Sequence, residues 1–137
     1  THRELATNLL SNLSQEDDLT TRSWVTKHPF TPINILKKLS KDQHWSVRAD
    51  TAENENIPED LLTDLANDPH YGVRAEVANH INTPEHILSN LSNDKSSLVR
   101  LRIARHPKTP LDTLHLLKKD PDIAIRHVAQ ERLKTNT

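Results

Sequence analysis

Apolar residues recur along this chain in two kinds of cluster. One kind holds two or three Leu or Ile residues, as in Ile35, Leu36 and Leu39. The other joins a β-branched residue to a small one, as in Val77 and Ala78. Members of a cluster are spaced for one side of a helix. The pattern therefore predicts short alternating helices along the whole chain, and no strand pattern competes with it.

The clusters alternate with a period of 26 residues. Five columns of residues can be followed at this step, which is the signature of a repeat protein. They are Arg22, Arg48, Arg74, Arg100 and Arg126; Pro32, Pro58, Pro84 and Pro110; Leu36, Leu62, Leu88 and Leu114; Leu39, Leu65, Leu91 and Leu117; and the acidic Glu16, Asp42, Asp68, Asp94 and Asp120. The predicted fold class is all-α, an α-solenoid (α/α superhelix) of tandem 26-residue two-helix repeats.

The columns also set the expected boundaries. We expect one repeat domain over residues 1–137, with a partial repeat at 1–20, full repeats at 21–46, 47–72, 73–98 and 99–124, and a C-terminal capping half-repeat at 125–137. A buried Leu or Val contributes about 1.5–3 kcal/mol. One unit alone cannot offset its ordering entropy, so several repeats must share interfaces.

Threonine or aspartate followed directly by proline suggests where a helix begins. Thr31-Pro32, Thr83-Pro84 and Thr109-Pro110 predict first helices with a threonine N-cap and proline in the first turn. Asp68-Pro69 and Asp120-Pro121 repeat this arrangement. We therefore expect the second helices to begin at the acidic column.

One segment carries a resemblance to a known family. The unit VRAEVANHINTPEHILSNLSND, residues 73–94, resembles the leucine-rich repeat variant family of bacteria, a relative of HEAT and armadillo repeats. The resemblance implies a fold of stacked short helices. It says little about activity, because the partners of such families are diverse. A known member carries a cysteine-bound iron–sulfur module. This chain has no cysteine, so no cofactor is expected.

Composition narrows the class of protein further. The hydrophobic share is 34%, which fits a thin core, and the formal net charge is -1, which gives no general attraction for polyanions. No apolar run approaches the roughly 18–20 residues of a membrane span. We expect no membrane partner and a cytoplasmic location.

The arginine and acidic columns stand six residues apart in every repeat. We interpret them as a structural ladder, in which each arginine reaches the acid of its own or the neighbouring repeat. The ladder comprises Asp42, Arg48, Asp68, Arg74, Asp94, Arg100, Asp120 and Arg126. The alternative is an arginine track for phosphates, but regular pairing with acids would leave little free charge.

Nine histidines raise the question of a metal site. His28, His80 and His106 share a column with Asn54, one repeat apart. A spacing of about 10 Å between packed helices is too long for a shared metal with bonds near 2.0–2.1 Å. We therefore expect no metal ligands, and we interpret this column as loop residues that hydrogen-bond turn backbone.

Aromatic and charged positions give the candidate partner-binding residues. Trp24, Trp45 and Tyr71 form either a recognition patch or packing between repeats, and exposure would distinguish the two. On the second helices an acidic-to-basic stripe, or else an ordinary solvated face, runs through Asp50, Glu53, Glu76, Arg102 and Arg105.

No catalytic motif stands out, so we expect no catalytic residues and no enzyme activity. The predicted function is a scaffold or protein–protein interaction module, with another protein or another domain of a longer chain as partner. The alternative is a HEAT-like nucleic-acid-binding module. Some solenoids of this shape resemble alkyl-base DNA glycosylases, although the acidic second repeat interrupts a basic face.

Overall fold

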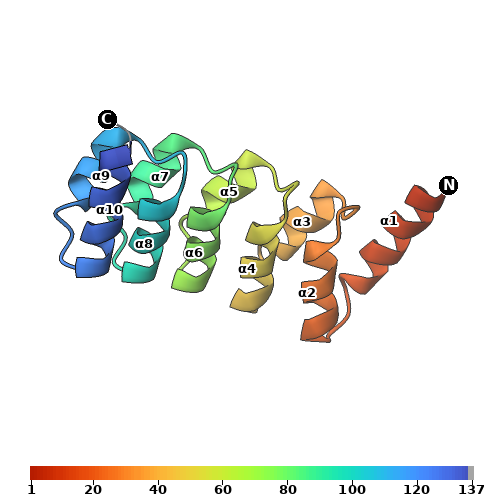
Figure 1. Cartoon of the computed structure of the whole chain (residues 1–137). Helices are drawn as coiled ribbons and strands as arrows, with labels where there is room; N and C mark the ends of the chain where they lie inside the picture. Colours follow the sequence, from red (N-terminus) through yellow and green to blue (C-terminus); the bar gives the residue numbers. More distant parts are fainter. Residues whose placement is uncertain (136–137) are drawn as a thin grey trace. The chain divides into compact units, whose positions relative to one another are not determined.

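The computed structural model describes residues 1–135, and every regular element in that range is a helix (Figure 1). Short first helices alternate with longer second helices, which confirms the predicted all-α fold of two-helix repeats. The helices are α1 His2–Leu13, α2 Leu19–Lys27, α3 Ile33–Leu39, α4 Trp45–Glu53, α5 Glu59–Leu65, α6 Tyr71–Asn79, α7 Glu85–Leu91, α8 Ser97–Arg105, α9 Leu111–Leu117 and α10 Ile123–Thr135.

The chain divides into two compact units, which we call unit 1 (residues 1–77) and unit 2 (residues 78–137). In unit 1, the second helices α2 and α4 pack side by side, with α3 and α5 against them. In unit 2, α8, α9 and α10 pack against one another. The boundary falls inside α6, and the single domain expected over residues 1–137 stays a prediction.

The core of each unit is one layer of side chains between first and second helices. In unit 1, Leu36 of α3 and Val47 of α4 are fully buried. In unit 2, Leu114 of α9 and Ile103 of α8 are equally buried. These are the leucine and β-branched columns of the sequence, and their burial supplies the apolar core of each unit.

The first helices begin one residue later than predicted. Pro32 and Pro110 occupy the N-cap position itself, with no side-chain cap. The Thr31 hydroxyl instead donates to the carbonyl oxygen of Val25 (2.5 Å), at the end of α2, and Thr109 donates to Ile103 in the same way (2.6 Å). The predicted threonine caps were therefore wrong, because each hydroxyl instead adds a bond to a carbonyl in the last turn of the preceding helix.

The second helices begin three residues after the acidic column, so the predicted start at the aspartates was also wrong. Asp68 accepts the backbone amide of His70 (2.9 Å), and Asp120 accepts that of Asp122 (2.8 Å). Each aspartate thus shapes the turn that leads into the helix. The next residues supply the cap: His44 Nδ1 accepts the amide of Ser46 at the start of α4 (3.2 Å).

Candidate interaction surface

Arg22, Arg48 and Arg100 each join a backbone carbonyl and a carboxylate of the acidic column, whereas Arg126 bonds the carbonyl oxygens of Asp120 and Pro121. Arg48 Nε and Nη2 donate to the Asp68 carboxylate (2.7 and 3.1 Å), while Nη1 donates to the carbonyl oxygen of Asp42 (2.8 Å). Arg22 pairs with Asp42 in the same way (2.8 and 3.1 Å). The sequence left open whether each arginine binds the acidic residue of its own repeat or that of the neighbouring repeat. The structure uses both: Arg22 and Arg48 each bind a backbone carbonyl of their own repeat and a carboxylate of the next repeat.

Unit 2 repeats this geometry, with Arg100 on the Asp120 carboxylate (2.8 and 3.4 Å) and on the Asp94 carbonyl (2.8 Å). The groups are largely buried and the pairing is bidentate, the geometry in which arginine binds carboxylate best. In unit 1, hydrogen bonding with Asp42 raises the pKa of Arg22. Burial opposes ionisation of Asp42, but the bonds from Arg22 lower its pKa overall. These bonds link successive repeats within each unit.

The histidine column forms a second set of links between repeats, which we call the clamp column: His28, Asn54, His80, His106 and Arg132. His106 Nδ1 accepts the amide of Lys108 (3.0 Å), and its Nε2 bonds the carbonyl oxygen of His80, one repeat earlier (2.7 Å). Asn54 makes the matching pair of bonds in unit 1, accepting from Asn56 (2.8 Å) and donating to Thr26 (2.5 Å). The predicted role of these residues, bonding turn backbone, is confirmed.

Arg132 is the member of the clamp column that the sequence analysis missed. Its guanidinium donates to the carbonyl oxygens of Ala104 (2.8 Å) and His106 (2.5 Å). Those carbonyls stand 28 and 26 residues earlier, as Thr26 and His28 do relative to Asn54. The 26-residue register alone could have identified it, since 132 follows 106 by one repeat.

Trp45 and Tyr71 lie in an exposed row of stacked rings at the N-terminal ends of α4 and α6. The Trp45 and His70 rings are nearly parallel, with centroids 4.0 Å apart. The Tyr71 ring also stacks on His70, at 5.0 Å between centroids. Trp45 is 41% exposed and Tyr71 52% exposed. A Cβ added to Gly72 would approach Trp45 to 2.8 Å, so glycine makes room for the indole.

Trp24 belongs to a separate aromatic group at the end of α2. Its ring lies 5.2 Å from that of His28, which in turn contacts Phe30 (5.6 Å). Trp24 is 51% exposed. The structure therefore does not join Trp24 to the row of Trp45 and Tyr71, and it leaves half of each of these three rings open to solvent.

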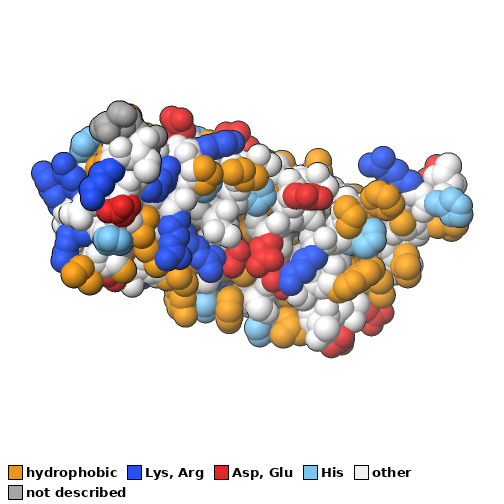
Figure 2. All heavy atoms as spheres, viewed as in Figure 1, with side chains coloured by type: hydrophobic (Ala, Val, Ile, Leu, Met, Phe, Trp, Pro, Cys, Tyr) orange, Lys and Arg blue, Asp and Glu red, His pale blue; other side chains and the backbone are white. Residues whose placement is uncertain are grey.

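The acidic part of the stripe gathers on α4 and α6 beside Trp24. Asp50 accepts a hydrogen bond from the Ser23 hydroxyl and pairs with Lys27 (3.6 Å). Burial and the neighbouring carboxylate of Glu76 raise the pKa of Glu53. Figure 2 shows acidic side chains together over α4 and α6.

The basic part of the stripe lies on unit 2. Arg105 is exposed at the end of α8, and Arg102 is half-buried one turn earlier. Further along, on α10, Glu131 pairs with Lys134 (3.1 Å). Lys and Arg side chains gather over α8 and α10 in Figure 2. The two signs predicted for this stripe thus fall on different units.

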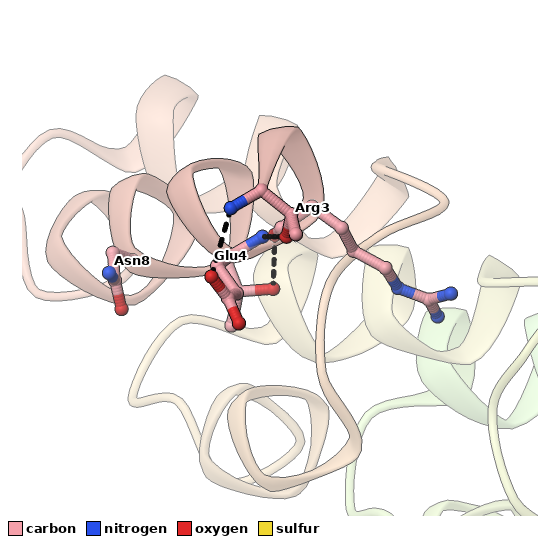
Figure 3. Close-up of a pocket in the computed structure, with 5 residues that line it drawn as sticks. Arg3, Glu4 and Asn8 are labelled. Atoms are coloured by element: carbon pink, nitrogen blue, oxygen red, sulfur yellow. Dashed lines mark hydrogen bonds and ion pairs between the residues drawn. The ribbon is translucent and has the colours of Figure 1, made fainter.

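A shallow hollow on α1 offers no comparable chemistry. It is lined by residues of a single helix and its cap, and the Thr1 ammonium bonds the Glu4 carboxylate across it (2.9 Å) (Figure 3). In residues 1–135 there is no group of three or more His, Cys, Asp or Glu side chains placed to hold a metal ion. None of the described helices combines the length and apolarity needed to cross a membrane.

The paired helices, the arginine ladder and the clamp column define a helical-repeat protein. The chain is similar to a solved structure described as a leucine-rich repeat variant with a novel repetitive protein structural motif: 26% of aligned residues are identical and the TM-score is 0.77. The match covers 92% of this chain and 50% of that one, so the chain spans about half its length. This confirms the resemblance inferred from the repeat unit. No protein-family model matches the chain, and no curated protein matches it.

Proposed function

We propose that this chain is a cytoplasmic, non-enzymatic helical-repeat module that binds another protein, or another domain, through its second helices. We call the surface used the second-helix face, defined as the sixth and ninth residues of α2 and α4, both in unit 1. They are Trp24, Lys27, Asp50 and Glu53.

The exposure of Trp24 is the observation that supports this proposal best. The chain holds only four aromatic residues, and its core is built without them from leucine, isoleucine, valine and alanine. A half-exposed tryptophan beside charged groups is the kind of residue that dominates binding energy at protein interfaces. A partner could cover the exposed half of this residue.

The test compares retained proteins from a lysate of the source organism. The immobilised wild-type chain is run beside Trp24→Ala, Glu53→Lys and a control, Leu111→Ala, which is 52% exposed on the first helix α9. We expect a protein that the wild type and the control retain and both face variants lose. A partner retained equally by all four chains would place binding elsewhere and refute the proposed face.

Nucleic acid is tested in parallel. Unit 1 holds eight Lys and Arg against thirteen Asp and Glu, a formal charge of -5, which disfavours phosphate contacts there. Labelled single- and double-stranded DNA and RNA should show no saturable change in fluorescence anisotropy at low or physiological salt. Saturable binding that weakens steeply with salt, as counterion release requires, would favour the nucleic-acid alternative.

A further inference from the structure

A second hollow in unit 1 lies between α1 and the loop that joins α2 to α3, and we call it the loop hollow. Its volume is about 470 Å³, which is within the range of sites that bind small ligands. Its walls come from Arg3 and Thr7 of α1 and from the apolar Pro29, Phe30, Pro32 and Ile33 of the loop and the start of α3.

The apolar wall of the loop hollow is open to solvent. Phe30 is 48% exposed and Ile33 is 60% exposed. One repeat later the same two positions hold the polar Asn56 and Glu59, so a two-helix repeat forms there without apolar residues at either position. Figure 2 shows hydrophobic side chains gathered over α1, α2 and α3. Exposed apolar surface beside a hollow is typical of a place where another molecule binds.

Hydrogen bonds fix the loop that forms this wall. The Phe30 amide donates to Nδ1 of His28 (3.1 Å). From the next repeat, Asn56 Nδ2 donates to the carbonyl oxygen of Pro29 (3.2 Å). The wall is therefore preorganised, which lowers the entropic cost of binding a ligand against it.

Arg3 is the only charged residue that lines the loop hollow. Its guanidinium carbon lies 5.7 Å from the centre of the Phe30 ring, so a cation–π contact holds the charge at the edge of the apolar wall. The neighbouring Glu4 bonds the Thr1 ammonium (2.9 Å), and Figure 3 shows the Arg3 side chain extending away from Glu4. Among the described residues no carboxylate pairs with Arg3. The hollow thus presents one positive charge beside an apolar surface.

We propose that the loop hollow binds the C-terminal residue of a peptide whose last side chain is apolar. That side chain lies against Phe30 and Ile33, and the terminal carboxylate accepts hydrogen bonds from Arg3. Asn56 uses its amide nitrogen on Pro29, which leaves its oxygen as an acceptor for the last N–H of the peptide. A peptide C-terminus carries a carboxylate and a side chain on one carbon atom, which matches a single cation beside an apolar wall.

A phosphate group fits this hollow less well. A phosphate ester carries up to two negative charges and is bound best by several charged donors. The loop hollow offers one cation, and the unit around it has a formal charge of -5. A carboxylate, with one negative charge, is therefore the better match.

The experiment measures the fluorescence anisotropy of labelled peptides titrated with the whole chain at physiological salt. The probe is a short glycine–serine peptide that ends in leucine with a free carboxylate. Two matched peptides each change one group: the first ends in leucine amide, and the second ends in serine with a free carboxylate. We expect each matched peptide to bind roughly 10-fold more weakly than the probe, or weaker still.

Charge removal tests the role of Arg3. Arg3→Gln should weaken binding of the probe by roughly 10-fold and should abolish the difference between the free acid and the amide, because the guanidinium no longer meets the carboxylate. Lys38→Gln removes the same charge from an exposed position of α3 and should bind like the wild type. Circular dichroism melts check that each variant keeps the fold.

Truncation of one wall residue tests the apolar contact. Ile33→Ala should weaken binding of the probe by roughly 3- to 10-fold. Its matched control is Leu111→Ala, because Leu111 is the exposed first residue of α9 as Ile33 is of α3. The control should bind like the wild type.

A probe that shows no saturable binding to the wild type would overturn the inference. An Arg3→Gln chain that still prefers the free acid over the amide would also overturn it. Octanoate is titrated into the wild type by calorimetry in parallel. Binding of octanoate without binding of the probe would assign the hollow to a free carboxylic acid and exclude the peptide end.

The inference goes beyond the proposed function, because the loop hollow shares no residue with the second-helix face. Retention of a lysate protein through Trp24 and Glu53 is a separate result. A chain that loses that retention can still bind the leucine peptide, and a chain that does not bind the peptide can still retain the protein. The two failures are therefore distinguishable.

Discussion

Unit 1 and unit 2 share one repeat fold and differ in almost everything that faces solvent. Unit 1 has a formal charge of -5 and contains all four aromatic residues. Unit 2 holds ten Lys and Arg against six Asp and Glu, a charge of +4, and has no aromatic residue. The ladder and the leucine columns recur in both units, while the clamp column makes the same kind of bond in each unit with different residues. The ladder and leucine positions are therefore kept from repeat to repeat, and we propose that recognition uses positions that vary.

The largest expected effect comes from breaking the ladder in either unit. Asp42→Ala leaves Arg22 without its carboxylate, and Asp120→Ala does the same to Arg100. Removing one partner of a largely buried pair costs about 3–5 kcal/mol, because the remaining charge is uncompensated. Urea unfolding should show a similar loss for both variants. Glu55→Ala, at an exposed turn position, is the control, expected within about 0.5 kcal/mol of wild type.

Equal losses would support a scaffold common to the two units. A loss below about 1 kcal/mol in either variant would mean that the ladder contributes little there, as exposed ion pairs usually do.

The clamp column predicts a smaller effect that differs between the units. Burial lowers the pKa of His106, so the unfolded chain binds the proton more readily than the folded one. The stability from neutral His106 is complete above the unfolded pKa of about 6.5, and it is lost as pH falls through the folded pKa. Asn54, its counterpart in unit 1, does not titrate.

His106→Asn isolates this contribution, because Asn54 shows that asparagine can make both bonds. Chemical unfolding between pH 7.5 and pH 5 should give the wild type a steeper loss of stability than the variant, with the difference growing as pH falls. Identical slopes would show that His106 does not couple protonation to folding. Asn54→His is the reciprocal variant and should make unit 1 more sensitive to acid.

The smallest expected effect concerns Gly72, where unit 1 differs from unit 2, which has Leu98 at the equivalent position. Alanine in a helix is favoured over glycine by roughly 0.5–1 kcal/mol. The added Cβ of Gly72→Ala would displace the Trp45 ring, so we expect a smaller gain and a change in tryptophan fluorescence.

The same substitution in a Trp45→Ala background removes the contact and should recover the full gain from helix propensity. If Gly72→Ala gives the same stability change in both backgrounds, the glycine does not serve the ring stack, and a double-mutant cycle measures this directly.

The repeat columns predicted the fold because they record packing that every repeat must satisfy. Arg48 and Asp68 could be assigned to a ladder from spacing alone. Helix starts could not be assigned, because threonine and aspartate side chains can bond several backbone groups, and tertiary packing decides which. Thr31 therefore bonds the preceding helix where a cap was expected.

The surface was harder to predict for the same physical reason. From the sequence, Trp45 could pack between repeats or belong to a recognition patch. In the structure it is half exposed and stacked on His70. The signal was present: His44 and His70 share a column directly before Trp45 and Tyr71. The raised pKa of Glu53 depends on which carboxylates meet in space, and the sequence gives no direct measure of that.

The account's central claim is that scaffold and recognition reside in separate columns of the repeat. The most direct test combines Trp24→Ala and Glu53→Arg in one chain and measures both unfolding free energy and protein association. We predict that stability stays within about 1 kcal/mol of wild type, because each site is exposed, while binding of the partner that the wild type retains is lost. A chain destabilised by several kcal/mol, or one that binds that partner as before, would contradict the claim.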